Sequence, residues 1–157
     1  MNLEYLMIHC TATPEGREVT AEDIRKWHIE GRGWSRVGYT DLIQLDGRII
    51  NLTPFDQDDE VESWELTNGA RGMNGISRHI VYSGGMDKDY KYAKDTRTEE
   101  QEYVMRAYVI EMVARYPNIK VCGHNQFANK ACPSFDVPSW LLGVIPQKNI
   151  HDKTYQK

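Results

Sequence analysis

The pattern of apolar and polar residues along the chain predicts short strands separated by two helices. Apolar runs bounded by polar or turn-forming residues indicate strands at residues 3–9, 40–45, 48–52, 79–83 and 119–122. Asp46-Gly47 lies between the second and third of these runs, and an Asp-Gly pair is a strong signal for a β-hairpin. We therefore expect an antiparallel strand pair in the first half of the chain.

Each of the two predicted helices follows a capping-box sequence, in which a threonine and a side chain three residues later satisfy free backbone amides. The pairs are Thr20 with Asp23 and Thr98 with Gln101. Two glycines end the first helix, and the second carries an apolar face at helical spacing until Tyr116-Pro117. The resulting order, β-α-β-β-β-α-β, predicts an α/β fold with a single mixed β-sheet flanked by helices.

Length and composition fit one domain of this kind. A chain of 157 residues can bury a substantial core, and a content of 40% hydrophobic and 27% charged residues is typical of a globular protein. We assign the domain to residues 1–145. Residues 146–157 are expected to form a loose polar C-terminal tail.

The charge balance excludes some classes of partner. A net charge of −4 gives no electrostatic footprint for nucleic acid, and an anionic membrane surface is an equally poor partner. No apolar run approaches the roughly 20 residues that a transmembrane helix needs. The N-terminus lacks the basic segment of a signal peptide, so we expect synthesis in the cytoplasm. We expect a monomer with neither a nucleic-acid partner nor a membrane-inserted segment.

Two histidines and a cysteine stand out as candidate chemistry. His9 and His124 each stand at the end of a predicted strand, and Cys132 lies in the loop that follows His124. Two imidazoles and a thiolate are an ordinary ligand set for Zn²⁺, and three protein ligands leave a fourth position open, as in catalytic zinc sites. Each residue alone is more often structural. The spacing leaves open whether the fold brings His9 to the other two.

Several segments in order resemble a known family. They lie at residues 8–13, 24–28, 33–39, 46–47, 69–74, 84–85 and 130–136, and the last reads Lys-Ala-Cys-Pro-Ser-Phe-Asp. From about Leu6 to Trp140 the chain resembles the zinc-dependent N-acetylmuramoyl-L-alanine amidases of the phage-lysozyme type, in the amidase type 2 and peptidoglycan recognition protein superfamily. The resemblance implies an amidase-like α/β fold and peptidoglycan as the substrate.

The same resemblance implies roles for individual residues. The family's zinc ligands fall on His9, His124 and Cys132, its catalytic tyrosine on Tyr39 and its catalytic lysine on Lys130. The chemistry of amide hydrolysis suits these residue types, because an ammonium can stabilise the developing oxyanion and a hydroxyl can orient the attacking water. Without the resemblance, a solvated loop lysine and a packing tyrosine would be the preferred interpretations.

Other positions depart from the family or have structural interpretations. Asn68 stands where relatives often carry a groove-lining histidine, which makes it a candidate substrate-binding residue, and His79 replaces a usual small residue. His28 is expected to make a hydrogen bond in the core or behind the ligands. His151 is expected to be solvated in the tail. Cys10 and Cys122 are interpreted as buried thiols, which could pair under oxidation if their strands are adjacent.

The main functional hypothesis is a zinc hydrolase that cleaves the amide between N-acetylmuramic acid and L-alanine. A phage or prophage endolysin, released to the cell wall by a separate factor, is the context that the resemblance implies. One alternative is a peptidoglycan-binding module without catalysis. Another is a metal-free cysteine hydrolase that uses Cys132 with His124, which a chelator would leave active.

Overall fold

The computed structural model describes residues 1–156. Five strands form one mixed sheet in the order β4-β3-β5-β1-β7, in which β3, β5, β1 and β7 are parallel and β4 is an antiparallel edge. Their bounds are β1 Tyr5–Cys10, β3 Asp41–Ile43, β4 Ile49–Asn51, β5 Ser77–Tyr82 and β7 Lys120–Gly123. The predicted single mixed sheet with flanking helices is confirmed.

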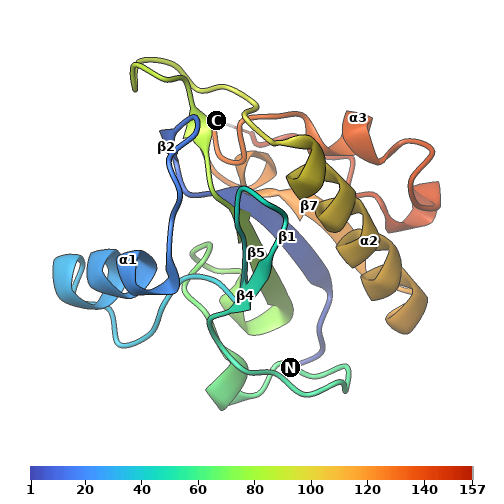
Figure 1. Cartoon of the computed structure of the whole chain (residues 1–157). Helices are drawn as coiled ribbons and strands as arrows, with labels where there is room; N and C mark the ends of the chain where they lie inside the picture. The colour runs from blue at the N-terminus through green and yellow to red at the C-terminus, as the bar shows by residue number, and fades with distance from the viewer. Residues whose placement is uncertain (157) are drawn as a thin grey trace.

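Helices cover both faces of this sheet (Figure 1). The long helix α2 and the short α3 lie on one side, and α1 lies on the other. A two-stranded sheet of β2 and β6 stands beyond the ends of β1 and β5. The bounds are α1 Ala21–Arg25, α2 Glu99–Arg115, α3 Val137–Leu141, β2 Thr13–Pro14 and β6 Gly85–Met86. Short helical turns complete the fold: η1 Lys26–Gly31, η2 Ser63–Glu65, η3 Asn74–Ile76, η4 His124–Gln126 and η5 Gln147–Asn149.

Local sequence signals define the helix starts. The side chains of Thr20 and Thr98 each accept a hydrogen bond from the backbone amide three residues later. The side-chain oxygens of Asp23 and Gln101 in turn accept one from the threonine N–H. Both predicted capping boxes are therefore confirmed. The first helix does not continue as an α-helix to its glycines, because it changes to the wider π geometry of η1 after Arg25.

Alternation along the strands divides the side chains between two cores. Leu6 and Ile8 of β1 and Ile80 of β5 point to the α2 side and join one buried cluster. Successive residues of a strand face opposite ways. His9 and His79 therefore face away from α2, toward the side on which α1 packs. Strand parity thus places two histidines on the same face of the sheet.

The C-terminal segment packs against the domain. Asn149 and Ile150 are buried, and Ile150 forms a β-bridge with Val121 of β7. The His151 ring stacks on Phe127 at a centroid distance of 4.7 Å. The expectation of a loose tail is therefore wrong up to His151, and so is the expectation of a solvated His151. The assignment of the domain end to residue 145 stays a prediction.

Across residues 1–156, no helix combines the length and the apolar character needed to cross a bilayer.

Candidate metal centre and active-site cleft

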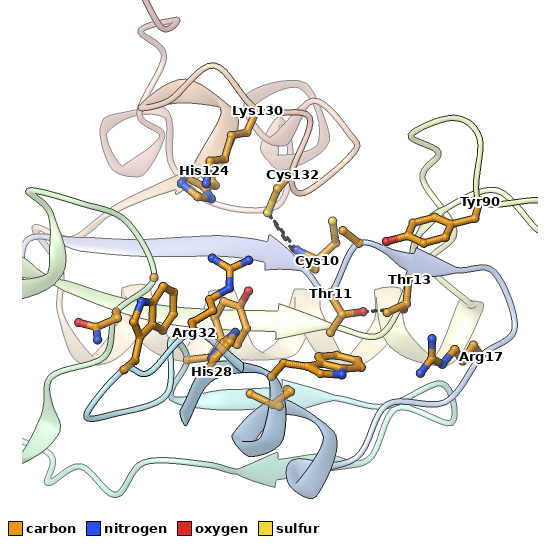
Figure 2. A pocket seen from close by; sticks show the side chains of 17 residues that line it. Cys10, Thr11, Thr13, Arg17, His28, Arg32, Tyr90, His124, Lys130 and Cys132 are labelled. Carbon is orange, nitrogen blue, oxygen red and sulfur yellow. Dashed lines mark hydrogen bonds between the residues drawn. The ribbon is translucent and has the colours of Figure 1, made fainter. Parts of the chain in front are cut away.

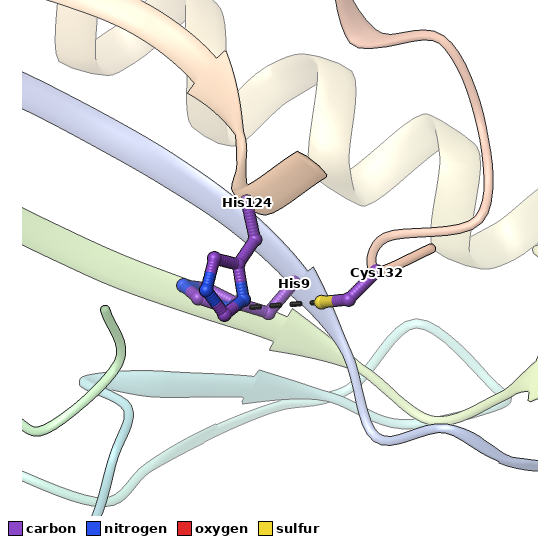
Figure 3. A group of neighbouring side chains, drawn as sticks. All are labelled: His9, His124 and Cys132. Atoms are coloured by element: carbon purple, nitrogen blue, oxygen red, sulfur yellow. Dashed lines mark hydrogen bonds between the residues drawn. The ribbon is translucent and has the colours of Figure 1, made fainter. Parts of the chain in front are cut away.

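The fold brings His9 together with His124 and Cys132, which lie more than a hundred residues further along the chain (Figure 3). His9 comes from β1, His124 directly follows β7, and Cys132 comes from the loop before α3. One potential ligand atom of each residue lies within 4.8 Å of the others. Nδ1 of His9 is 3.7 Å from Sγ of Cys132, and the two imidazole centroids are 4.7 Å apart. Because β1 and β7 are neighbours in the sheet, His9 and His124 lie close together, which the sequence spacing alone left open.

Both imidazoles of this group are neutral at neutral pH. His9 is 1% exposed, and burial, with smaller effects of His79, His124 and Lys130, lowers its pKa well below the ordinary value. Burial, with a smaller effect of Lys130, lowers the pKa of His124 to about 4. A metal ligand must present an unprotonated nitrogen, so both residues are in the form that coordination requires.

Cys132 is held against the backbone of β1. The Cys10 N–H donates to Sγ of Cys132 at 3.2 Å, an arrangement that suits a sulfur carrying negative charge. A side-chain hydrogen bond with Cys10, together with burial, raises the pKa of the Cys132 thiol. A bound cation of the zinc type favours the thiolate instead. Two neutral nitrogens and one sulfur in mutual reach therefore fit a tetrahedral metal with one open position.

A cleft of about 450 Å³ opens beside this group (Figure 2). His124 and Cys132 line it, and two tryptophans and two arginines lie along the cleft, with Arg17 near Trp27 and Arg32 near Trp34. In Figure 2, Lys130 and His124 lie together on one side of the cleft. A polar, aromatic-lined cleft next to a metal-type ligand set is the expected form of a hydrolase site.

Tyr39 and Lys130 both border the cleft. The Tyr39 ring centroid is 5.2 Å from that of His9, and burial raises the pKa of Tyr39 above its ordinary value. The hydroxyl therefore remains a hydrogen-bond donor at neutral pH. Lys130 is exposed in the loop between His124 and Cys132, and its positive charge contributes to the lowered pKa of His9 and His124.

Asn68 and His28 also line the cleft, in different ways. Asn68 is half-buried, and its N–H is bonded to the Val37 carbonyl. Its predicted role in substrate binding stays a prediction. Nδ1 of His28 accepts a hydrogen bond from the Gly38 N–H at 3.0 Å, so the expected hydrogen bond of His28 is confirmed. This bond fixes the segment that leads to Tyr39.

Sequence reasoning left His79 without a role, and the structure places it directly behind His9. Nδ1 of His79 is 2.8 Å from Nε2 of His9, and His79 is fully buried. The strand pattern predicted that His79 belongs to a strand. Its contact with His9 depends on the pairing of β1 with β5, which the sequence does not encode locally.

The remaining thiols are buried and free. Cys10 and Cys122 belong to the adjacent strands β1 and β7. Cys122 is paired in register with Met7, three residues before Cys10, and its Sγ donates to the Leu6 carbonyl. The interpretation of both residues as buried thiols is confirmed.

A second group of acidic side chains has a structural explanation. Asp56, Glu62 and Glu65 lie close together, but the Glu65 carboxylate accepts hydrogen bonds from the backbone amides of Asp56 and Glu62. The bond from Glu62 caps the short helix η2, and the bond from Asp56 ties the preceding loop to this helix. The three acidic side chains therefore have a structural role in the loop between β4 and β5.

Comparisons with known proteins agree with this fold. The N-acetylmuramoyl-L-alanine amidase family matches residues 1–135. The endolysin of Enterobacteria phage T3 is 33% identical over 139 residues, covering 87% of this chain and 84% of that protein. The endolysin of Escherichia phage T7 is 32% identical over 137 residues, covering 86% and 83%. The structure of an endolysin from a Thermus scotoductus bacteriophage superposes with a TM-score of 0.70 at 24% identity, covering 96% of this chain and 87% of that one.

A mixed sheet with a three-residue metal-type ligand group beside a cleft is an arrangement typical of metal-dependent hydrolases. The family match over residues 1–135 identifies the particular family. The chain belongs to the N-acetylmuramoyl-L-alanine amidase family.

Proposed function

We propose that this protein is a zinc-dependent endolysin that hydrolyses the amide bond between N-acetylmuramic acid and L-alanine in peptidoglycan. The convergence of His9, His124 and Cys132 beside the cleft is the observation that carries the proposal. Family membership and the similar phage endolysins support the substrate and the biological setting.

His9, His124 and Cys132 would hold the zinc ion. A zinc ion in such a site supplies an activated water and a Lewis acid for the scissile carbonyl. His9 and His124 contribute as neutral ligands, and Cys132 as the single anionic one, so the site retains positive charge. The remaining steps depend on the protein's own side chains around the cleft.

Lys130 and Tyr39 are proposed to act on the reacting amide. The Lys130 ammonium borders the same cleft as His124 and can approach the oxyanion that forms when water adds to the carbonyl. The protonated Tyr39 hydroxyl can donate a hydrogen bond to that intermediate or hold the attacking water. Asn68, which also lines the cleft, is proposed to contact the substrate.

A metal-free cysteine hydrolase is the weaker candidate. Its nucleophile would be the Cys132 thiolate, yet the hydrogen bond with Cys10 and burial raise the pKa of this thiol. A nucleophilic cysteine needs the opposite shift. A chelator that abolishes activity, with recovery on addition of Zn²⁺, supports the metal enzyme over the cysteine enzyme.

Mass spectrometry of digested peptidoglycan tests the reaction. The proposal requires free stem peptides with L-alanine at the N-terminus and intact glycan strands. New reducing sugar ends without new amino termini would mean a glycosidase. Binding to peptidoglycan without any product would mean a binding module, so the same digestion separates the enzyme from that alternative.

A further inference from the structure

We propose that His79 is a positioning residue that fixes the tautomer and orientation of His9 for metal binding. The proposal rests on the metal site proposed above and goes beyond it by assigning a role to a residue behind the ligands. A chain of hydrogen bonds links the Ala70 backbone amide to Asn74, Asn74 to His79, and His79 to His9.

The geometry of this connection follows from the sheet. Met7 of β1 is paired with His79 of β5, and His9 lies two residues further along β1, on the same face. The two imidazole centroids are 4.9 Å apart, with Nδ1 of His79 2.8 Å from Nε2 of His9. Nε2 of His79 is 3.0 Å from Oδ1 of Asn74.

The direction of each hydrogen bond follows from one backbone amide. The Ala70 N–H donates to Oδ1 of Asn74 at 2.9 Å, which identifies that atom as the amide oxygen. An amide oxygen only accepts, so Nε2 of His79 must carry a proton. The two nitrogens of His79 face a neutral amide and an imidazole, and neither offsets a buried positive charge, so the ring is neutral.

A neutral imidazole with a proton on Nε2 has a bare Nδ1. Nδ1 of His79 therefore accepts, and Nε2 of His9 donates to it. His9 then has its lone pair on Nδ1, the atom that lies 3.7 Å from Sγ of Cys132. The chain of bonds thus leaves the lone pair of His9 pointing into the ligand group. Metal-bound histidines generally need such a partner on the other nitrogen.

Gly69 helps to hold the His79 ring in this position. A Cβ at Gly69 would lie 2.4 Å from Cγ of His79, closer than any real contact, so the ring occupies the space that a side chain there would need. The loop backbone at Gly69 and the amide of Asn74 therefore confine the ring from two directions. His79 does not border the cleft with His124 and Lys130, so we assign it to positioning and not to catalysis.

If His79 only filled space in the core, the tautomers of His9 and His79 would not have to be the ones that the proposal requires. Long-range proton–nitrogen NMR of the metal-free protein reports the tautomer of each imidazole directly. We expect both His9 and His79 to carry their proton on Nε2. A proton on Nδ1 of His79 overturns the proposal, whatever the activity of the protein.

Zn²⁺ affinity, measured by competition with a chromophoric chelator, tests the consequence. His79→Leu fills similar space without an acceptor and should weaken Zn²⁺ binding by roughly 10- to 100-fold. His79→Asn keeps an acceptor oxygen near the position of Nδ1, so its Zn²⁺ affinity should stay within about threefold of that of the parent. Unchanged affinity in His79→Leu overturns the role of His79 while leaving the zinc site intact.

A second pair of variants covers the case in which His79→Leu does not fold. Asn74 is half-buried in η3, so its replacement perturbs the core less. Asn74→Asp keeps an acceptor for both donors and should retain Zn²⁺ affinity, whereas Asn74→Leu should weaken it. Equal affinity in these two variants overturns the proposal. A parent protein that binds no Zn²⁺ overturns the proposed metal centre and the role of His79 together.

Discussion

The ring of His79 occupies the space of the side chain that Gly69 lacks. An added Cβ at Gly69 would come within 2.4 to 2.6 Å of three atoms of that ring. Gly69 belongs to the loop before η3, and His79 lies in the middle of β5. The two residues therefore act as one packing unit, in which a glycine allows an imidazole to reach His9.

Gly69→Ala should destabilise the protein by about 1 to 3 kcal/mol, because the new methyl group overpacks a site already filled by the His79 ring. In a His79→Ala background the same substitution should cost little, since the space is then free. Urea unfolding of the four proteins of this double-mutant cycle measures the coupling, expected at about 0.5 to 3 kcal/mol.

Gly31→Ala is the matched control, because a Cβ there meets only the Lys26 carbonyl oxygen, at 3.6 Å. Its effect on the free energy of unfolding should lie between zero and a stabilisation of about 1 kcal/mol. If Gly69→Ala lowered the free energy of unfolding equally with and without the His79 ring, the proposed packing of Gly69 against His79 would be contradicted.

The metal-free protein should lose stability as the pH falls below about 6.5, and His79 should contribute to this loss. Burial, with a smaller effect of His124, lowers the pKa of His79 to about 3 in the folded state. The unfolded chain has the ordinary value near 6.5 and takes up the proton first. The stabilisation from a neutral His79 is therefore present above pH 6.5 and declines toward pH 3, by at most about 1.4 kcal/mol per pH unit.

Comparison of the parent with His79→Asn separates the pH-dependent contribution of His79 from that of the carboxylates, which are the same in both proteins. The parent should lose more stability than the variant between pH 7 and pH 5, so the difference between their free energies of unfolding should narrow on acidification. Urea unfolding of both proteins, stripped of metal, measures that difference. A difference that is the same at both pH values would contradict the prediction.

Much of the fold is predictable from local sequence because its signals are local. The two threonine capping boxes and the Asp46-Gly47 turn specify α1, α2 and the β3–β4 hairpin through neighbouring residues alone. The short helix α3 was not predicted, although it has a similar signal: the Asp136 side chain accepts a hydrogen bond from the Ser139 amide. The two-residue strands β2 and β6 carry no pattern long enough to detect.

The site was only partly predictable, for a physical reason. The three candidate ligands can be named from residue type and family resemblance, but their convergence requires the pairing of β1 with β7. The contact of His79 with His9 requires in addition the pairing of β1 with β5 and a glycine in a distant loop. The packing of His151 on Phe127 likewise depends on where the C-terminal segment returns to β7.

We expect one zinc ion per chain, and Cys132→Ser should lose most of the metal and most of the activity. A serine hydroxyl is a much poorer zinc ligand than a thiolate, because it remains protonated at neutral pH. Elemental analysis of the purified proteins, together with peptidoglycan digestion, measures both effects. Cys122→Ser is the control, because Cys122 lies in β7 and is not one of the three candidate ligands.

A fully active and metal-free Cys132→Ser protein would exclude both the zinc site and a cysteine nucleophile. Loss of activity with retention of zinc would instead favour the cysteine nucleophile. Loss of both, with zinc and activity retained in the Cys122→Ser control, is the outcome that the ligand geometry predicts.

Lys130→Ala should keep the fold and the zinc but lose roughly 3 kcal/mol of transition-state stabilisation, seen mainly in kcat. Lys130 is exposed and borders the cleft beside His124, so its removal creates no cavity in the core. An oxyanion donor strengthens its interaction only as charge develops on the carbonyl oxygen, which is why kcat should change more than KM. Tyr39→Phe should also keep zinc and show a smaller loss, since only a hydroxyl is removed.

Lys88→Ala is the control for the loss of one exposed positive charge, because Lys88 lies in the loop after β6 and does not border the cleft. Its rate of peptidoglycan hydrolysis and its zinc content should match those of the parent. If Lys130→Ala also hydrolyses peptidoglycan at the parent rate, Lys130 is a solvated loop residue, and the oxyanion must be stabilised by other groups of the cleft. The zinc ligands would be unaffected by that result, because metal content is measured separately on the same proteins.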